Sequence, residues 1–309
     1  MGIEPVKTIW MNGELVPWES ATCHVMSHVL HYGSSVFEGL RCYDTPAGPK
    51  IFRLNAHTRR LFDSAKIYRM PLNYSHQQIN EACKAVIREN GLTSAYIRPL
   101  VYHGFGTLAV LPPDDATTDV VVAAINWGAY LGDDGIQNGI DVCVSSWHRM
   151  TSASNPILSK AGGHYLNSQL VAGDARRGGY AEALVVNANG TISEGSAENI
   201  FIARDGTLFT PPVTASILNG ITRDSVITIA RDLGIPVVEK DLPRDFLYVA
   251  DEIFLTGTAA EVTPVRSVEN LPVGNGKPGP ITQQIQAAFF GLFNGETKDQ
   301  WDWLSDVGD

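Results

Sequence analysis

Short strands joined by tight turns dominate the second half of the sequence. The stretch from 182 to 209, EALVVNANGTISEGSAENIFIARDGTLF, is interrupted at Asn189-Gly190 and at Asp205-Gly206. Such dipeptides supply the two positive-φ residues of a tight hairpin turn. The apolar, β-branched segments on either side of the turns are typical of strands. This part of the chain is therefore predicted to form an antiparallel meander.

The first 127 residues mix strands with helices. TIWMNGELVPW predicts a hairpin, because Asn12-Gly13 fits its turn. We expect Asn55 to cap a helix over AHTRRLFDSAKIY, and Ser75 to cap a second helix that ends at Gly91. AYIRPLVY and TDVVVAAINW are rich in β-branched and aromatic residues and are predicted to be strands.

A polar, turn-forming stretch, GAYLGDDGIQNG, follows Trp127 and suggests a linker. We therefore expect a small N-terminal domain over 1–127, an interdomain loop over 128–138 and a large domain over 139–309. The large domain would begin with the strand IDVCVSSW and contain the helices TRDSVITIARDLG and ITQQIQAAFFGLF. The fold class predicted is α+β in two domains, with much antiparallel sheet.

Composition narrows the possible partners. The chain is 44% hydrophobic and 18% charged, as is usual for a globular enzyme, and its net charge of -10 disfavours nucleic acid and anionic membranes. Neither a membrane-spanning run nor a secretory signal is visible. Cys23, Cys42, Cys83 and Cys143 are widely spaced, which favours reduced thiols in a cytoplasm over disulfides or a zinc site.

Lys160 stands alone among small neutral residues, in SKAGGHYLNSQL. An amine is a nucleophile only when unprotonated, and the ordinary lysine pKa of about 10.4 leaves it charged. Burial among neutral neighbours would lower that pKa, the usual preparation for imine chemistry. The alternative is a surface lysine in a neutral loop.

Three further stretches carry residues suited to a cofactor. Glu194 and Glu198, in TISEGSAENIF, could place a buried carboxylate against a pyridine nitrogen, or could line a solvated turn. Gly220 precedes a predicted helix, whose first amides could bind a phosphate together with Thr222. TGTAAE, at 256–261, offers a second hydroxyl-rich turn. A simple helix cap and a simple loop are the alternatives.

Two other patterns favour ordinary structure. GNGKPG, at 274–279, matches the dinucleotide-binding pattern formally, but it lacks a preceding strand of useful length and contains a proline, so we expect a turn. His24, His28 and His31 have near-helical spacing, yet without a further ligand they indicate packing or interface histidines, and we expect no metal site.

Taken together and in this order, these stretches resemble the branched-chain amino-acid aminotransferases. The motifs that carry the resemblance are SKAGGHYLNSQL, ISEGSAENIF, GITRD, TGTAAEVTPVRSV and the N-terminal HVMSHVLHYGSSVFEGLRCY. The likeness covers nearly the whole chain. It implies a pyridoxal-phosphate enzyme of fold type IV, with a smaller N-terminal α/β domain and a larger C-terminal domain of mostly antiparallel sheet or barrel.

The resemblance also implies roles toward pyridoxal 5′-phosphate. Lys160 would form the Schiff base and then move the proton between substrate and cofactor. Glu194 would pair with the pyridine nitrogen, and Tyr165 would hydrogen-bond the phenolic oxygen. The phosphate would be held by a cation and a helix terminus. The residues implied for it are Arg60, Ile221, Thr222 and Thr258.

For the substrate, the resemblance implies an aromatic wall and two carboxylate sites. The wall residues implied are Phe37, Tyr96, Trp127 and Tyr130. The first carboxylate would lie near the backbone amides of Thr258 and Ala259. The second carboxylate of glutamate would be bound by Arg98, together with Tyr32 from a neighbouring subunit.

The activity implied is transfer of the amino group of L-leucine, L-isoleucine and L-valine to 2-oxoglutarate, giving branched-chain 2-oxo acids and L-glutamate. The site would be shared in a homo-oligomer that is at least a dimer. An (R)-selective amine transaminase, a D-amino-acid aminotransferase and an aminodeoxychorismate lyase share the fold and stay open. A nicotinamide oxidoreductase and a non-catalytic binding protein are alternatives from other classes.

One loop departs from the family. After YIRPL, bacterial members commonly carry a Gly-Met-Gly-Val-type turn before a pair of prolines, whereas this chain has GTLAVLPP at 106–113. In the family this loop closes the pocket of the adjacent subunit. The range of acceptors and amines accepted therefore stays open.

Overall fold

The computed structural model describes residues 3–127 and 132–308, in two compact units. Unit 1 comprises Met1–Trp127, Ser159–Gly163 and Asp299–Asp309. Unit 2 comprises Gly128–Leu158 and His164–Lys298. Two short segments thus belong to unit 1 although their sequence neighbours belong to unit 2, a division that the sequence does not predict.

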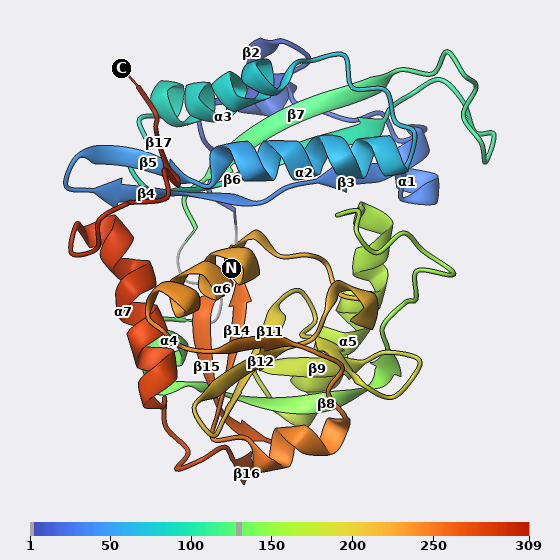
Figure 1. The fold of residues 1–309 in the computed structure, drawn as a ribbon. Coiled ribbons are helices and arrows are strands. Elements are labelled where there is room, and N and C mark those ends of the chain that lie inside the picture. Colours follow the sequence, from blue (N-terminus) through green and yellow to red (C-terminus); the bar gives the residue numbers. More distant parts are fainter. Residues whose placement is uncertain (1–2, 128–131, 309) are drawn as a thin grey trace. The chain divides into compact units, whose positions relative to one another are not determined.

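Unit 1 is built on an eight-stranded antiparallel sheet (Figure 1). Its strands are β1 (Thr8–Met11), β2 (Glu14–Pro17), β3 (Ser35–Phe37), β4 (Leu40–Thr45), β5 (Gly48–Phe52), β6 (Ala95–His103), β7 (Thr118–Ile125) and β17 (Leu304–Asp306). The order is β17-β5-β4-β6-β7-β1-β2, and β3 pairs with β6. The C-terminal segment joins this unit because β17 pairs with β5.

The local chemistry of unit 1 agrees with the sequence in most places. Asn12 and Gly13 have φ of 49° and 101°, and they form the predicted turn between β1 and β2. Helix α3 (His76–Asn90) begins after Ser75, which forms a full capping box, and it ends at Gly91. Both predictions are confirmed.

The predicted cap at Asn55 is wrong. Helix α2 (Leu54–Ile67) begins two residues earlier than predicted, after Arg53, which has φ of 54°. The Arg53 amide donates to the Trp303 carbonyl at 2.6 Å, so pairing with the C-terminal segment fixes where the helix starts. The Asn55 side chain accepts a hydrogen bond from Asn80 of α3 instead.

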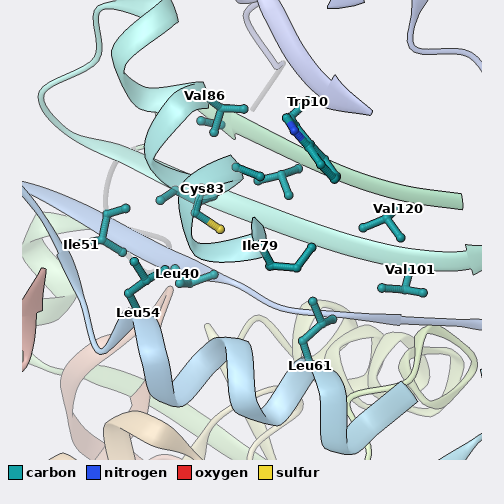
Figure 2. Packing of buried hydrophobic residues seen from close by; sticks show 14 of the residues in the cluster. Trp10, Leu40, Ile51, Leu54, Leu61, Ile79, Cys83, Val86, Val101 and Val120 are labelled. Carbon is teal, nitrogen blue, oxygen red and sulfur yellow. The ribbon is translucent and has the colours of Figure 1, made fainter. Parts of the chain in front are cut away.

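Helices α2 and α3 pack against one face of the sheet and against each other, whereas the short helix α1 (His28–Tyr32) contacts β6 (Figure 1). Figure 2 shows Leu61 of α2 and Ile79 and Cys83 of α3 among the sheet residues Val101 and Val120. These side chains form one core, which fixes the position of α2 relative to the strands.

Unit 2 contains a nine-stranded, mostly antiparallel sheet and four α-helices among its described residues (Figure 1). The strands are β8 (Ile140–His148), β9 (Glu182–Val186), β10 (Ile192–Glu194), β11 (Asn199–Arg204), β12 (Thr207–Thr210), β13 (Val237–Glu239), β14 (Glu252–Gly257), β15 (Glu261–Val268) and β16 (Leu271–Pro272). The helices are α4 (Asp133–Asn138), α5 (Tyr165–Gly178), α6 (Ile221–Asp232) and α7 (Pro280–Asn294).

The predicted meander is right for its two hairpins and wrong for their junction. Strand β9 pairs with β10 and β11 pairs with β12, but β8, β15 and β14 lie between the two hairpins in the sheet. The chain breaks the meander at Gly195, whose amide donates to the Glu198 carbonyl in a tight turn. Strand β10 nevertheless contacts β11, because the sheet curls.

The two faces of the unit 2 sheet are covered differently. Val142 and Leu184 point into a core enclosed by the curled sheet. The next residues along the same strands, Cys143 and Val185, pack against α5. Among the described residues, the helices are all too short or too polar to cross a membrane.

Replacing Leu61 by alanine should destabilise unit 1 by about 2 to 5 kcal/mol, because the change leaves a cavity in a closed core. Leu61 is 0% exposed, whereas Leu15, the control position, is 40% exposed. Urea unfolding followed by circular dichroism measures the shift. Leu15→Ala should cost less than about 1 kcal/mol, and equal losses in the two variants would contradict the packing described here.

Candidate active site

The predicted site residues fall in both units. Unit 1 contains Tyr32, Phe37, Arg60, Tyr96, Arg98, Trp127 and Lys160. Unit 2 contains Tyr165, Glu194, Ile221, Thr222, Thr258 and Ala259. Tyr130 lies outside the described residues. Each group is built from its own strands and helices.

Lys160 is held in unit 1 through its backbone. Its carbonyl accepts a hydrogen bond from the Phe37 amide at 3.0 Å, and its amide donates to the Ser64 hydroxyl of α2 at 3.0 Å. The next residue, Ala161, forms a β-bridge with Val36. These bonds fix the lysine between strand β3 and helix α2.

The glycine pair after Lys160 allows this close approach. A Cβ at Gly162 would overlap the Ser35 hydroxyl, and Gly163 packs against the backbone of Gly33, which has φ of 65°. In the described structure the two glycines therefore bring the Lys160 segment close to β3 and its preceding turn.

Phe37, Tyr96, Arg98 and Trp127 form a cluster beside Lys160. The Arg98 guanidinium carbon lies 4.7 Å from the centre of the Phe37 ring and 5.3 Å from that of Tyr96. The Tyr96 and Trp127 rings meet edge to face at 4.6 Å. Lys160 Nζ lies 5.0 Å from the Phe37 ring. The cluster offers aromatic surface next to two cations.

Tyr32 belongs to a different group. Its hydroxyl donates to the Leu108 carbonyl at 2.8 Å, and its ring packs against His28 at 4.6 Å. Over residues 3–127, neither a hydrogen bond nor a ring contact joins Tyr32 to Arg98. His28 Nε2 also forms a hydrogen bond with the Ala109 carbonyl. This bond connects helix α1 to the divergent loop, residues 106–113, which departs from the family.

Arg60 is bound by a residue that could not be singled out from the sequence. Glu38, 0% exposed, receives Arg60 Nε on Oε1 at 2.6 Å and Nη2 on Oε2 at 2.9 Å. His57 Nδ1 lies 2.7 Å from the same Oε2. Arg60 and His57 hold the pKa of Glu38 well below its ordinary value, against the effect of burial. The carboxylate is therefore ionised at neutral pH.

Glu194 is the centre of the site residues in unit 2. Its Oε1 lies 2.7 Å from Nη2 of the buried Arg149, and its Oε2 accepts bonds from the Asn199 side chain and the Leu218 amide. Arg149 also donates to Ser168 of α5, three residues after Tyr165. The carboxylate is thus fixed from several sides, as a partner for a ring nitrogen needs to be.

Asn199 links Glu194 to the predicted phosphate residues. Its side chain also donates to the Leu218 carbonyl, and its backbone pairs with Thr256 at the start of the TGTAAE turn. A Cβ at Gly220 would overlap the Asn199 side chain. Helix α6 therefore begins at Ile221 after a residue that has no side chain to cap it.

A second acidic pair lies beside Glu194. Glu198 shares a hydrogen bond with Glu182, which also accepts from the Ser196 hydroxyl at 3.0 Å. Burial and the neighbouring Glu182 carboxylate raise the pKa of Glu198 well above its ordinary value. The alternative of a solvated turn is therefore wrong for Glu194 and Glu198, which are both buried.

GNGKPG and the three N-terminal histidines, both expected to have structural roles, form contacts with other protein groups. GNGKPG forms a turn before α7, and the Glu252 carboxylate occupies the first amides of that helix at Ile281 and Thr282. An anion there would meet a carboxylate, which removes the basis for a dinucleotide site. The ring nitrogens of His24, His28 and His31 bond protein groups instead. Among the described residues, groups of metal-binding side chains are absent.

Glu38, His57, Arg149 and Asn199 were not predicted as site residues. Glu38 stands in VFEGL, inside a stretch quoted for the resemblance, but nothing in that stretch points to Arg60 as its partner. Arg149 follows strand β8 as an isolated cation, but its partner is remote in sequence. Position along the chain alone could not connect them.

The site residues thus include two buried acid–arginine pairs, Glu38–Arg60 in unit 1 and Glu194–Arg149 in unit 2, and Lys160 belongs to unit 1. The comparisons are specific. Residues 35–268 match the family Amino-transferase class IV. A branched-chain-amino-acid aminotransferase of Salmonella typhimurium is 58% identical, over 97% of this chain and 97% of that protein. This chain therefore belongs to the class IV aminotransferase family.

Solved structures agree with the family. The Escherichia coli branched-chain amino acid aminotransferase superposes with a TM-score of 0.97 and 56% identity, over 98% of this chain and 100% of that one. The branched-chain amino acid aminotransferase of Thermobaculum terrenum, solved in its PLP-form, gives 0.92 and 36%, over 99% and 100%. Pyridoxal 5′-phosphate is the cofactor of this family, and a lysine, a buried carboxylate and an open helix start suit its aldehyde, ring nitrogen and phosphate.

Replacing Glu198 by glutamine should make stability less sensitive to high pH. Because folding raises the pKa of Glu198, its protonated form adds stability that is lost as the pH rises above the ordinary value. The variant should gain stability relative to the parent as the pH rises above about 5, measured by urea unfolding. The exposed Glu296→Gln serves as control, and parallel curves for parent and E198Q would contradict the raised pKa of Glu198.

Proposed function

We propose that this protein transfers the amino group of L-leucine, L-isoleucine or L-valine to 2-oxoglutarate, giving branched-chain 2-oxo acids and L-glutamate. The observation that carries the proposal is the cluster of Lys160 with Phe37, Tyr96 and Arg98. It puts a reactive amine, an apolar aromatic wall and a carboxylate-binding cation together. The names of the related enzymes support the same substrates.

Each polar group of the cofactor has a candidate partner. Arg60, the start of α6 at Ile221 and Thr222, and Thr258 would hold the phosphate, because cations and helix termini stabilise a dianion. Tyr165 would bind the phenolic oxygen. Glu194, held by Arg149, would pair with the ring nitrogen. When bound, the cofactor supplies an electron sink for the charge that develops at the substrate's α-carbon.

The protein's own part is to bind, orient and move a proton. The Lys160 amine would take the proton from the α-carbon of the amino acid and deliver it to C4′ of the cofactor, in the half-reaction that yields the keto acid. Phe37, Tyr96, Trp127 and Tyr130 would exclude water around the branched side chain. The substrate carboxylate would bind near the amides of Thr258 and Ala259, and Arg98, with Tyr32 of a second copy, would take the distal carboxylate of glutamate.

Lys160→Ala should lower the rate of L-leucine with 2-oxoglutarate by at least about a thousandfold, because the variant lacks the proton carrier. A coupled assay for L-glutamate measures the rate, and borohydride reduction followed by peptide mapping should put a phosphopyridoxyl group on Lys160 of the parent. Lys66→Ala, an exposed lysine on α2, is the matched control. A label on another side chain would refute the assignment.

A substrate panel separates the members of this fold. Half-reactions with L-leucine, D-alanine and (R)-1-phenylethylamine report the three activities directly. We expect L-leucine to react fastest, since Arg98 and the aromatic rings suit an L-amino acid and a dicarboxylate alternately. A preference for D-alanine or the aromatic amine would favour the D-amino-acid aminotransferase or the (R)-selective amine transaminase.

We further propose that the enzyme is at least a homodimer. Apolar side chains of the segment before α1, of α1 and of residues 105–113 are strongly exposed. They are Val25 at 71%, Leu30 at 60%, Phe105 at 72%, Val110 at 78% and Leu111 at 82%. Monomers rarely expose a group of large apolar side chains on neighbouring segments. A second copy of this chain would cover them, and Tyr32 in α1 would then be near a second subunit.

Leu111→Asp should weaken self-association, because a charge would be buried at the contact. The dissociation constant of the dimer should rise about tenfold or more, measured by analytical ultracentrifugation. Leu271→Asp, at an exposed position in β16, is the control and should leave the dimer intact. A monomeric parent enzyme would contradict the proposal.

A cytoplasmic location is also proposed. It is supported by the state of the cysteines: Cys23, Cys42, Cys83 and Cys143 are all free thiols. Unpaired cysteines are typical of reducing compartments.

A further inference from the structure

We propose that Glu38 is a positioning residue, which fixes the guanidinium of Arg60 in the orientation that receives the cofactor's phosphate, with His57 as a second support. The inference rests on the proposed assignment of Arg60 to the phosphate. It adds a function for two residues that neither motif nor composition identifies.

The contact between Glu38 and Arg60 has the form of a two-bond fork. Arg60 Nε donates to Oε1 at 2.6 Å and Nη2 donates to Oε2 at 2.9 Å. A guanidinium carries five N–H groups in one plane, so this fork uses one edge. The remaining hydrogens lie on the other edge and have a fixed direction. The pair thus fixes the plane and the direction of the Arg60 guanidinium.

Glu38 is itself fixed on all sides. Its backbone amide donates to the Pro99 carbonyl at 2.8 Å, which ties it to strand β6. Its Oε2 also accepts from the Gly39 amide at 3.3 Å, and a Cβ at Gly39 would overlap the ring of Tyr96. The Glu38 carboxylate therefore has little conformational freedom, and its two hydrogen bonds restrict the orientation of Arg60.

His57 completes the support without adding charge. Burial lowers the pKa of His57, which favours the neutral imidazole. With the proton on Nδ1, the ring donates to Glu38 Oε2 at 2.7 Å. The three side chains together are then close to electrically neutral, because Glu38 balances Arg60. What Glu38 contributes is position, since by charge alone it weakens the attraction of Arg60 for an anion.

The same helix face also holds the lysine. His57, Arg60 and Ser64 are three and four residues apart on α2, so they lie on one face. Ser64 accepts the hydrogen bond from the Lys160 amide. Arg60 and Ser64 are about one helical turn, or about 5.4 Å, apart along the axis. The aldehyde and the phosphate-bearing arm occupy neighbouring ring carbons of pyridoxal phosphate, so residues that bind them must be this close.

The stability of the fold does not by itself explain a buried acid here. A charged pair removed from water is often no more stabilising than well-packed apolar residues of similar volume. The pair does leave one face of the guanidinium organised, which apolar residues would not achieve. This distinction can be measured.

The test compares pyridoxal 5′-phosphate with pyridoxal, which lacks the phosphate. Glu38→Gln keeps the volume but replaces one acceptor of the fork by an N–H donor. The dissociation constant for pyridoxal phosphate, from absorbance titration of the cofactor-depleted full-length enzyme, should rise about tenfold or more, and that for pyridoxal less than about twofold. Glu81→Gln, on the exposed side of α3, is the matched control and should change neither constant.

Arg60→Ala distinguishes two claims: that Arg60 binds the phosphate, and that Glu38 positions Arg60. It should weaken pyridoxal phosphate selectively, and Glu38→Gln should add nothing in its background, because the two changes act through one contact. Should Arg60→Ala leave the ratio of the two constants unchanged, the assignment of Arg60 to the phosphate fails. Should Arg60→Ala weaken pyridoxal phosphate selectively while Glu38→Gln does not, or should Glu38→Gln tighten pyridoxal phosphate, the positioning role alone fails.

His57→Leu provides a second variant if Glu38→Gln does not fold. It removes one support but keeps the fork between Glu38 and Arg60. The constant for pyridoxal phosphate should rise selectively, by less than in Glu38→Gln, and His57→Asn, which retains a donor near the Nδ1 position, should restore it. Equal weakening of pyridoxal and pyridoxal phosphate would overturn the role of this support.

Discussion

The backbone hydrogen bonds of Lys160 are the constraint on which the site in unit 1 depends. The segment 159–163 leaves its sequence neighbours and joins β3 and α2, through the Phe37 amide and the Ser64 hydroxyl. Two glycines make the approach sterically possible. These bonds fix the backbone of Lys160, and its amine lies at the end of a four-carbon stem. A lysine that is both a nucleophile and a proton carrier needs a backbone in a fixed position and an amine that can reach more than one atom.

Turn chemistry and periodicity were enough to predict most elements. Asn12-Gly13 and the capping box at Ser75 are local signals, and the structure confirms both. Pairing order was not available from the same signals. Strands β10 and β11 follow one another across the Gly195 turn, yet three other strands lie between their hairpins in the sheet. Which strand pairs with which depends on packing over long distances, and no dipeptide records it.

The same limit applies to the candidate site: residues that differ from their sequence neighbours could be predicted, but pairs that are distant in sequence could not. Lys160 and Glu194 stand out because each is an odd residue in its own neighbourhood. Glu38 and Arg60, by contrast, are separated by 22 positions and reach each other only after α2 packs on the sheet. Lys160 was also predicted to be isolated from charge, whereas the fold gives His57 an electrostatic contact with it. Residues that support a functional group have no chemistry of their own to reveal them.

The two buried acid–arginine pairs use one physical device in opposite senses. In unit 2 the acid, Glu194, would contact the cofactor, and Arg149 holds it in place. In unit 1 the cation, Arg60, would make the contact, and Glu38 holds it. A charged side chain removed from water needs a partner of opposite charge. Each of the two residues proposed to contact the cofactor, Glu194 and Arg60, therefore has a second charged residue that supports it. The supporting residue has to be rigid, because a mobile one could move and disturb the contact between its partner and the ligand. In both pairs the supporting residue, Glu38 or Arg149, is buried.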